Sequence, residues 1–206
     1  MDYLAYYDLE HYLFDRVAPA FHRCGTLGAF DFFSIVVWKA NRSRSVTARR
    51  LLRLGHARGL GDLDHICRTI GKALATAATD PQRLDVLLRD WGFRLPMASA
   101  ILTVLYPDRF TVYDYRLCEQ LEQLGQGTFK MLADKADLAA IQHGYQTFIK
   151  AVRCVQASLR IETLRDTDRY LIARSMANDL TQAIQHRFSR PAATTGSNPP
   201  TLGLPC

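Results

Sequence analysis

The sequence predicts an all-α protein. Apolar residues recur at the spacing of one helix face along most of the chain. Strand signals are nearly absent, and the short β-rich stretch RFTVYDY, residues 109–115, suits an extended link between helices better than a sheet. The 206 residues, 48% of them hydrophobic, are enough for one domain with a sizeable core. We therefore expect a globule of about nine or ten helices.

Start and stop signals divide the first half of the chain into helices. The segment CGTLGAF ends a first helix, and Asp31 is a candidate N-cap for the apolar segment after it. Gly55 ends a third helix, and one or two more follow it. Pro81 occupies a favoured position in the first turn of the next helix. These signals place helices at residues 3–23, 31–41, 45–55, 60–79 and 80–91.

The second half is divided in the same way. Gly92 ends one helix, and Pro96 starts another that stops before Pro107. Asp114 precedes the next apolar segment, which ends near Gly125. The later segments begin after residue 125 and include the charged sequence RDTDR, which we interpret as a helix start with ion pairs that face solvent. The expected helices cover residues 96–106, 114–125, 139–159 and 165–188.

The composition limits the partners and the compartment. The formal net charge is +6, and arginine supplies most of the positive charge, which suits contact with phosphate groups. No apolar run has the length of a membrane span, and the N-terminus has no signal-peptide pattern, so we expect a cytoplasmic protein that does not bind membranes. The five cysteines and six histidines form no metal-ligand motif, which argues against a metal or an iron–sulfur cluster. Residues 1–188 are expected to form one domain, and residues 189–206, rich in Pro, Ser, Thr and Gly, a disordered tail.

Three segments are candidates for function. The first is the hairpin LLRDWGFRLPMASAIL, in which the second helix starts with free backbone N–H groups beside Arg94. Such a helix start binds phosphate, although the same pattern also describes an ordinary helical hairpin. The second is Asp114, whose carboxylate would be fixed and kept ionised as an N-cap. A carboxylate held in this way stabilises a developing cation and activates water, but it also serves as a cap with no other role.

The third candidate is a basic segment without acidic residues between Asp31 and Asp62. It is either a solvated face or a surface for nucleic acid. Its seven basic residues are Lys39, Arg42, Arg44, Arg49, Arg50, Arg53 and Arg58.

Taken in order, these segments resemble the helix-hairpin-helix DNA glycosylase superfamily of base excision repair. The similar parts are the hairpin DWGFRLP, the helix MASAIL and the segment YPDRFTVYDYRL, which carries Asp114 at a spacing that suits the family. Upstream, FFSIVVWKANRSRSVTARRL is similar to the family's early apolar helix and polar loop, with Asn41 at the position of the side chain that fills the gap left by a flipped base. The resemblance covers residues 30–125 in detail.

The resemblance implies a two-lobed fold with a cleft, a central lobe from about residue 31 to residue 125, and a second lobe from residues 1–30 and 126–188. It implies a monomeric, nucleoid-associated enzyme that flips a modified base out of double-stranded DNA and hydrolyses its N-glycosidic bond, either in repair or in defence against phage DNA. Asp114 would be the catalytic residue. Trp38, Tyr113 and Tyr115 are candidates for the base pocket, although such aromatic residues also suit a core. The implied DNA-binding residues are Gly92, Arg94, Met97, Ala98, Lys39, Asn41, Arg42 and Arg44.

The sequence also departs from the family pattern. The hairpin has one glycine, Gly92, where the family usually has two. Pro96 stands where bifunctional members have a catalytic lysine, which implies a monofunctional enzyme that leaves an intact abasic site. The C-terminal cysteine cluster of some members is missing, so no cofactor is implied beyond a structural monovalent cation at the hairpin. The alternatives are a non-catalytic DNA-binding relative and an all-α protein-interaction module.

Overall fold

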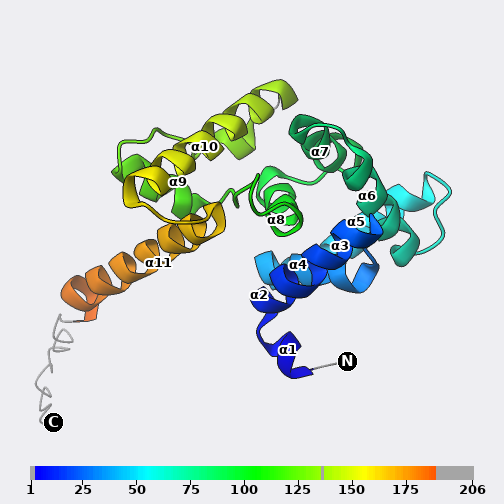
Figure 1. Cartoon of the computed structure of the whole chain (residues 1–206), viewed down its shortest axis with the longest axis horizontal. Helices are drawn as coiled ribbons and strands as arrows, with labels where there is room; N and C mark the ends of the chain where they lie inside the picture. Colours follow the sequence, from blue (N-terminus) through cyan, green and yellow to red (C-terminus); the bar gives the residue numbers. More distant parts are fainter. Residues whose placement is uncertain (1–2, 136, 189–206) are drawn as a thin grey trace, which may run out of the picture.

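The computed structural model describes residues 3–135 and 137–188, and all of their regular structure is helical (Figure 1). The all-α prediction is therefore confirmed for this part of the chain. The segment for which we expect a disordered tail, residues 189–206, lies outside the described residues.

The first helical segment is divided at Asp8. The Asp8 side chain accepts a hydrogen bond from the His11 backbone N–H at 3.1 Å, so it caps a new helix start inside the single helix predicted from residue 3. Gly25, with a φ of 62°, ends the segment in the left-handed region that glycine tolerates best. Its elements are α1 (Tyr3–Tyr7), α2 (Leu9–Tyr12), η1 (Leu13–Val17) and α3 (Ala18–Cys24).

The next helices pack around α4, one side of which is buried. Phe32, Ile35 and Val36 are fully buried on one side of α4 at helical spacing. Helix α6 is one continuous helix where the sequence allowed one or two. The elements are α4 (Ala29–Ala40), η2 (Asn41–Ser43), α5 (Arg44–His56), α6 (Leu63–Thr76), α7 (Asp80–Asp85) and η3 (Val86–Asp90).

Helix α8 (Leu95–Leu105) lies in the middle of the molecule (Figure 1). It is buried on nearly every side, because Ala98, Ser99 and Ala100 are small enough for other segments to approach closely. The Ser99 hydroxyl accepts a hydrogen bond from the Tyr113 backbone N–H at 2.9 Å. This bond holds the extended segment after α8 against the helix and so fixes the entry to α9.

The remaining helices pack on one another on the other side of α8. The Tyr145 hydroxyl of α10 donates to the Thr111 carbonyl at 2.6 Å, which holds the extended segment from its second side. The buried residues of both sides belong to one hydrophobic core. The elements are α9 (Tyr115–Gln123), η4 (Leu132–Asp134), α10 (Leu138–Leu159), α11 (Leu164–Gln182) and η5 (Ala183–Phe188).

Candidate active site

Asp114 is the N-cap of α9, as the sequence predicts. Its backbone is extended, with φ −141° and ψ 148°, and its Oδ1 accepts a hydrogen bond from the Arg116 backbone N–H at 3.0 Å. The cap fixes the carboxylate relative to the helix that it starts. Asp114 is therefore a rigidly held negative charge.

The second oxygen of Asp114 is bound by Lys39. The Lys39 Nζ atom, on the last turn of α4, donates to Asp114 Oδ2 at 2.6 Å. The Lys39 and Asp114 side chains are 14% and 23% exposed, so the ion pair is only partly screened by solvent. Burial, the largest single effect, raises the pKa of Asp114, but the charge and hydrogen bond of Lys39 together with the backbone hydrogen bond and charge of Arg116 outweigh it and lower the pKa below its usual value. Asp114 is thus ionised at neutral pH.

Lys39 and Asp114 line a cavity of about 340 Å³, which is within the range of small-molecule sites. Trp38 of α4 contributes an aromatic wall, and Ile172 of α11 contributes an apolar one. The cavity also contains the buried carboxylate of Asp168. An apolar wall with a few fixed charges is the general composition of a site that orients a small polar group.

Asp168 differs from the solvent-facing ion pairs that we expected for RDTDR. Its side chain is only 2% exposed, and its Oδ2 accepts a hydrogen bond from Arg165 Nη1 at 2.6 Å. Burial raises the pKa of Asp168 to about 6, and the positive charge of Arg165 opposes this rise. The prediction holds for the helix start and for the Asp166–Arg169 pair, whose side chains are 48% and 52% exposed. It is wrong for Arg165 and Asp168, which lie on the side of α11 that packs against the rest of the molecule, and a short charged segment does not reveal this.

Arg165 connects α11 to the N-terminal helices around this cavity. Besides Asp168, it binds Glu10 of α2 at 2.7 Å. Its guanidinium also stacks on the Phe14 and Trp38 rings, at 4.7 and 5.1 Å from their centroids. The cavity wall is therefore held by a cation with two carboxylate partners and two aromatic partners.

The Gly92 turn joins two helices as the sequence predicts, and arginines of α5 and the following turn bind its carbonyl groups. Gly92 has a φ of 62°, and its carbonyl accepts a hydrogen bond from Arg50 Nη1 at 2.6 Å. Arg58 donates to the Asp90 carbonyl and stacks on Trp91. Arg50 thus provides a positive charge at the turn where the resemblance implies a monovalent cation.

The start of α8 and the basic segment share a second cavity of about 550 Å³, which we call the basic groove. Arg42, Arg94 and Met97 line it, and Lys39 lines both this cavity and the one that contains Asp114. Arg94 is the N-cap of α8, is 72% exposed, and pairs with Asp134 at 2.7 Å. Two of the three candidate segments therefore meet in one groove that adjoins Asp114.

The other predicted DNA-binding residues lie in different environments. Ala98 is fully buried in the core, so it acts by letting other segments approach α8. Arg44 and Asn41 are exposed near the groove, where Arg44 donates to the Asn41 side-chain oxygen at 2.9 Å. Their bond joins η2, which occupies the predicted polar loop, to the first residue of α5.

Of the three predicted base-pocket aromatics, the structure places Trp38 at the cavity. Tyr113 is 3% exposed, and its hydroxyl donates to the Phe129 carbonyl at 2.6 Å, so it belongs to the core. Tyr115 is 59% exposed and lies beside Arg116 rather than in the cavity wall. Successive side chains of an extended segment point to opposite sides, which separates Tyr113 from Asp114.

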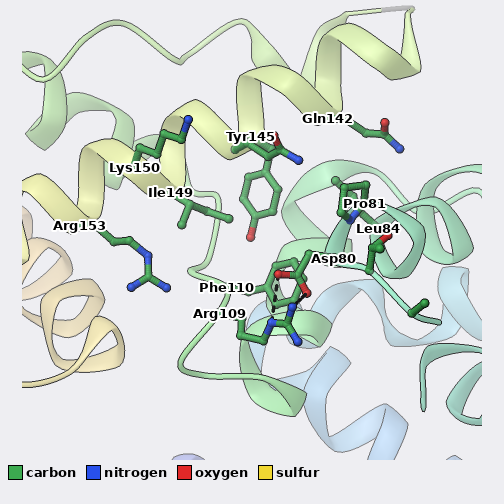
Figure 2. A pocket seen from close by; sticks show the side chains of 13 residues that line it. Asp80, Pro81, Leu84, Arg109, Phe110, Gln142, Tyr145, Ile149, Lys150 and Arg153 are labelled. Carbon is green, nitrogen blue, oxygen red and sulfur yellow. Dashed lines mark hydrogen bonds and ion pairs between the residues drawn. The ribbon is translucent and has the colours of Figure 1, made fainter. Parts of the chain in front are cut away.

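A further cavity of about 410 Å³ lies between α7 and α10 (Figure 2). Its arginines already have partners: Arg109 pairs with Asp80 at 3.0 Å, and Arg153 donates to the Asp108 carbonyl at 2.7 Å. Lys150 of α10 lies at its edge and is exposed. The carboxylate of this cavity, Asp80, is 34% exposed, compared with 23% for Asp114 and 2% for Asp168, so this cavity is the weaker candidate for a site with a fixed, buried charge.

Within residues 3–135 and 137–188, no group of His, Cys, Asp and Glu has an arrangement suited to a metal ion. The four cysteines in this part of the chain are free thiols. None of the helices described combines the length and the hydropathy needed to cross a membrane.

The chain matches no family model, no curated protein and no solved structure.

Proposed function

We propose that this protein is a DNA glycosylase that hydrolyses the N-glycosidic bond of a modified nucleotide. The observation that carries this proposal is the fixed, ionised carboxylate of Asp114 in a cavity beside a basic groove. The sequence resemblance to helix-hairpin-helix glycosylases supports it. In this proposal the central lobe of about residues 31–125, which carries α4, α8 and Asp114, faces the second lobe of residues 1–30 and 126–188, and the target nucleotide enters between them.

Asp114 would act on the sugar rather than on the base. When the bond between C1′ and the base breaks, the bonding electrons leave with the base and the sugar becomes an oxocarbenium-like cation. The carboxylate offsets this charge and orients a water molecule toward C1′. The water adds to C1′ and gives up a proton, the base takes up a proton, and an abasic site remains. Because Lys39 already neutralises part of the carboxylate charge, the sugar cation competes with Lys39 for Asp114.

The groove would hold the DNA backbone. Arg42 and Arg94 carry exposed guanidinium groups suited to phosphate, and Asn41 lies on the loop that the resemblance places at the vacated base position. Trp38 would stack on the flipped base inside the cavity. Alkylated, oxidised, deaminated and hypermodified bases are all candidates, and a hypermodified phage base would make the protein a defence enzyme.

A panel of duplexes, each with one modified base, tests the proposal. Incubation with the protein followed by alkali should cleave at least one of them at the modified position, because alkali breaks the strand at an abasic site. If the protein binds the duplexes and releases no base from any of them, a non-catalytic DNA-binding role is the better interpretation. If it does not bind DNA at all, the protein-interaction alternative is favoured.

Arg94→Glu should weaken DNA binding to every sequence by a similar factor, since phosphate contacts carry no base information. If about four to six phosphates are neutralised, the wild-type slope of log K against log salt should be roughly −4 to −5, and the variant should lose roughly one unit of it. Fluorescence anisotropy at several salt concentrations measures both slopes. Lys150→Glu makes the same change in charge on α10 and should alter the slope less. Equal slopes for all three proteins would mean that Arg94 does not contact the DNA phosphates.

A further inference from the structure

The cavity between α7 and α10, which we call the α7–α10 cavity, has more positive than negative charge (Figure 2). Arg109, Lys150 and Arg153 line it, and among the described residues of its wall Asp80 is the one carboxylate. Three cations and one carboxylate leave an excess of two positive charges. Asp80 also binds Arg83, at 3.2 Å, so its charge is divided between two arginines. Within the described residues, neither Lys150 nor Arg153 pairs with a carboxylate.

Both arginines of this cavity are held by one edge of the guanidinium group and have N–H groups left over. Arg109 uses Nε and Nη2, each 3.0 Å from an oxygen of Asp80. Arg153 uses Nη2, which donates to the Asp108 carbonyl at 2.7 Å. In the described part of the chain, the Nη1 groups of both arginines donate to no protein atom. A guanidinium that is already positioned loses little conformational freedom when its remaining N–H groups bind an anion.

The three cations reach the cavity from two segments of the chain. Arg109 lies on the extended link after α8, whereas Lys150 and Arg153 lie three residues apart on α10 and so share one helix face. Because the Asp108 carbonyl belongs to the peptide bond that precedes Arg109, Arg153 is bonded to the chain directly beside Arg109. Figure 2 shows Lys150 and Arg153 extending from α10, and Arg109 beside Asp80.

Much of the remaining wall is apolar. Pro81 and Leu84 of α7 and Ile149 of α10 line it, together with the rings of Phe110 and Tyr145. Its volume of about 410 Å³ is within the range of small-molecule sites. Fixed guanidinium groups next to an apolar surface suit a ligand that has an anionic end and an apolar or flat body.

We propose that the α7–α10 cavity binds a small phosphate monoester whose body has the size of a mononucleoside. A phosphate monoester has a charge of about −1.5 to −2 at neutral pH, which matches the excess of two positive charges in the cavity. Its three terminal oxygens accept hydrogen bonds from both arginines at once, whereas a carboxylate offers two oxygens. The site is independent of the proposed function, because Asp114 and the basic groove belong to other cavities.

Calorimetric titration with adenosine 5′-monophosphate (AMP) tests this inference. The wild-type protein should bind one AMP per chain with a dissociation constant below about 1 mM. Adenosine lacks the phosphate and should bind at least about 10-fold more weakly. Inorganic phosphate should also bind more weakly than AMP, because it leaves the apolar wall uncovered.

Two substitutions in the cavity should weaken AMP binding by different factors. Arg153→Gln should weaken it by about 10-fold or more, because it removes a positioned, charged donor. Lys150→Gln should weaken it by about 3-fold, because Lys150 is exposed. Lys150 has no partner among the described residues, so this variant keeps the test valid if thermal melting shows that Arg153→Gln does not fold.

Arg23→Gln and Lys72→Gln are the matched controls and should leave AMP binding unchanged. Arg23 of α3 and Lys72 of α6 are exposed and do not line the cavity. No saturable AMP binding at about 1 mM, equal affinities for AMP and for adenosine or inorganic phosphate, or wild-type affinity in both cavity variants would overturn the inference. A short DNA duplex without terminal phosphates should not displace AMP, and displacement would assign the cavity to the DNA backbone instead.

Discussion

Asp114→Asn should lower base release by about a hundredfold or more, because a neutral amide does not offset the charge of a cationic sugar. Asparagine has nearly the same size, and its side-chain oxygen still accepts the Arg116 N–H as an N-cap. The amount of abasic site formed over time, on a duplex found with the panel, measures the loss. A rate equal to the wild-type rate would limit Asp114 to capping α9.

Two further effects of this substitution follow from Lys39. The ammonium loses its charged partner at a position where the pair is only partly exposed, so the free energy of unfolding should fall by about 1–2 kcal/mol. DNA affinity should hold or rise, because a negative charge near the phosphates has gone and Lys39 is free to bind them. Gel-shift titration and urea unfolding separate these effects from catalysis.

Asp137→Asn is the matched control. Asp137 is the N-cap of α10 and accepts hydrogen bonds from the Ala139 and Ala140 backbone N–H groups, but it is exposed and does not line the cavity. The same substitution there should leave base release unchanged. Equal losses in both variants would mean that the effect comes from capping in general.

Local chemistry in the sequence was sufficient to predict the helices and the cap. Asp114 follows a β-rich link and precedes an apolar helix, so its capping role depends on neighbouring residues. The glycine turn before α8 and the early proline in that helix are equally local signals. Two predictions in the first half were wrong. The helix from residue 3 is not continuous, because Asp8 is a capping residue inside an otherwise helical pattern. Asp31 is not an N-cap, because α4 already begins after Gly28 and Asp31 lies in its first turn.

The contacts that define the cavity were not predictable in the same way. Lys39 and Asp114 are separated by 75 positions, and only the packing of α4 beside the extended segment brings them together. A lysine on the apolar stripe of a helix was a signal that its amine needs a buried partner, but the stripe does not say which one. Asp168 was misplaced for the related reason that charge alone does not distinguish the two faces of α11.

Arg165→Met should reduce the free energy of unfolding by about 3 kcal/mol or more at pH 8, because it leaves the Asp168 carboxylate buried without its cation. Methionine preserves much of the side-chain length and its packing on Phe14 and Trp38, so the lost charge dominates the change. Urea unfolding at several pH values measures the effect. Arg169→Met is the matched control, since Arg169 also binds Glu10, at 2.8 Å, but is 52% exposed and should contribute less than about 1 kcal/mol.

The loss in the free energy of unfolding caused by Arg165→Met should become smaller as the pH falls toward 5. The pKa of Asp168 is about 6 in the folded protein and 3.8 for an ordinary aspartate, so between these values the folded state binds more protons than the unfolded state. The contribution of Asp168 to the free energy of unfolding is therefore highest at low pH, and in the wild type it is lost as the pH rises through about 6. Without Arg165 the pKa rises further, so the fall continues to higher pH, whereas at pH 5 a protonated Asp168 needs no cation. A deficit of equal size at pH 5 and pH 8 would show that the stability effect of Arg165 comes from its contacts with Glu10 and the aromatic rings rather than from Asp168.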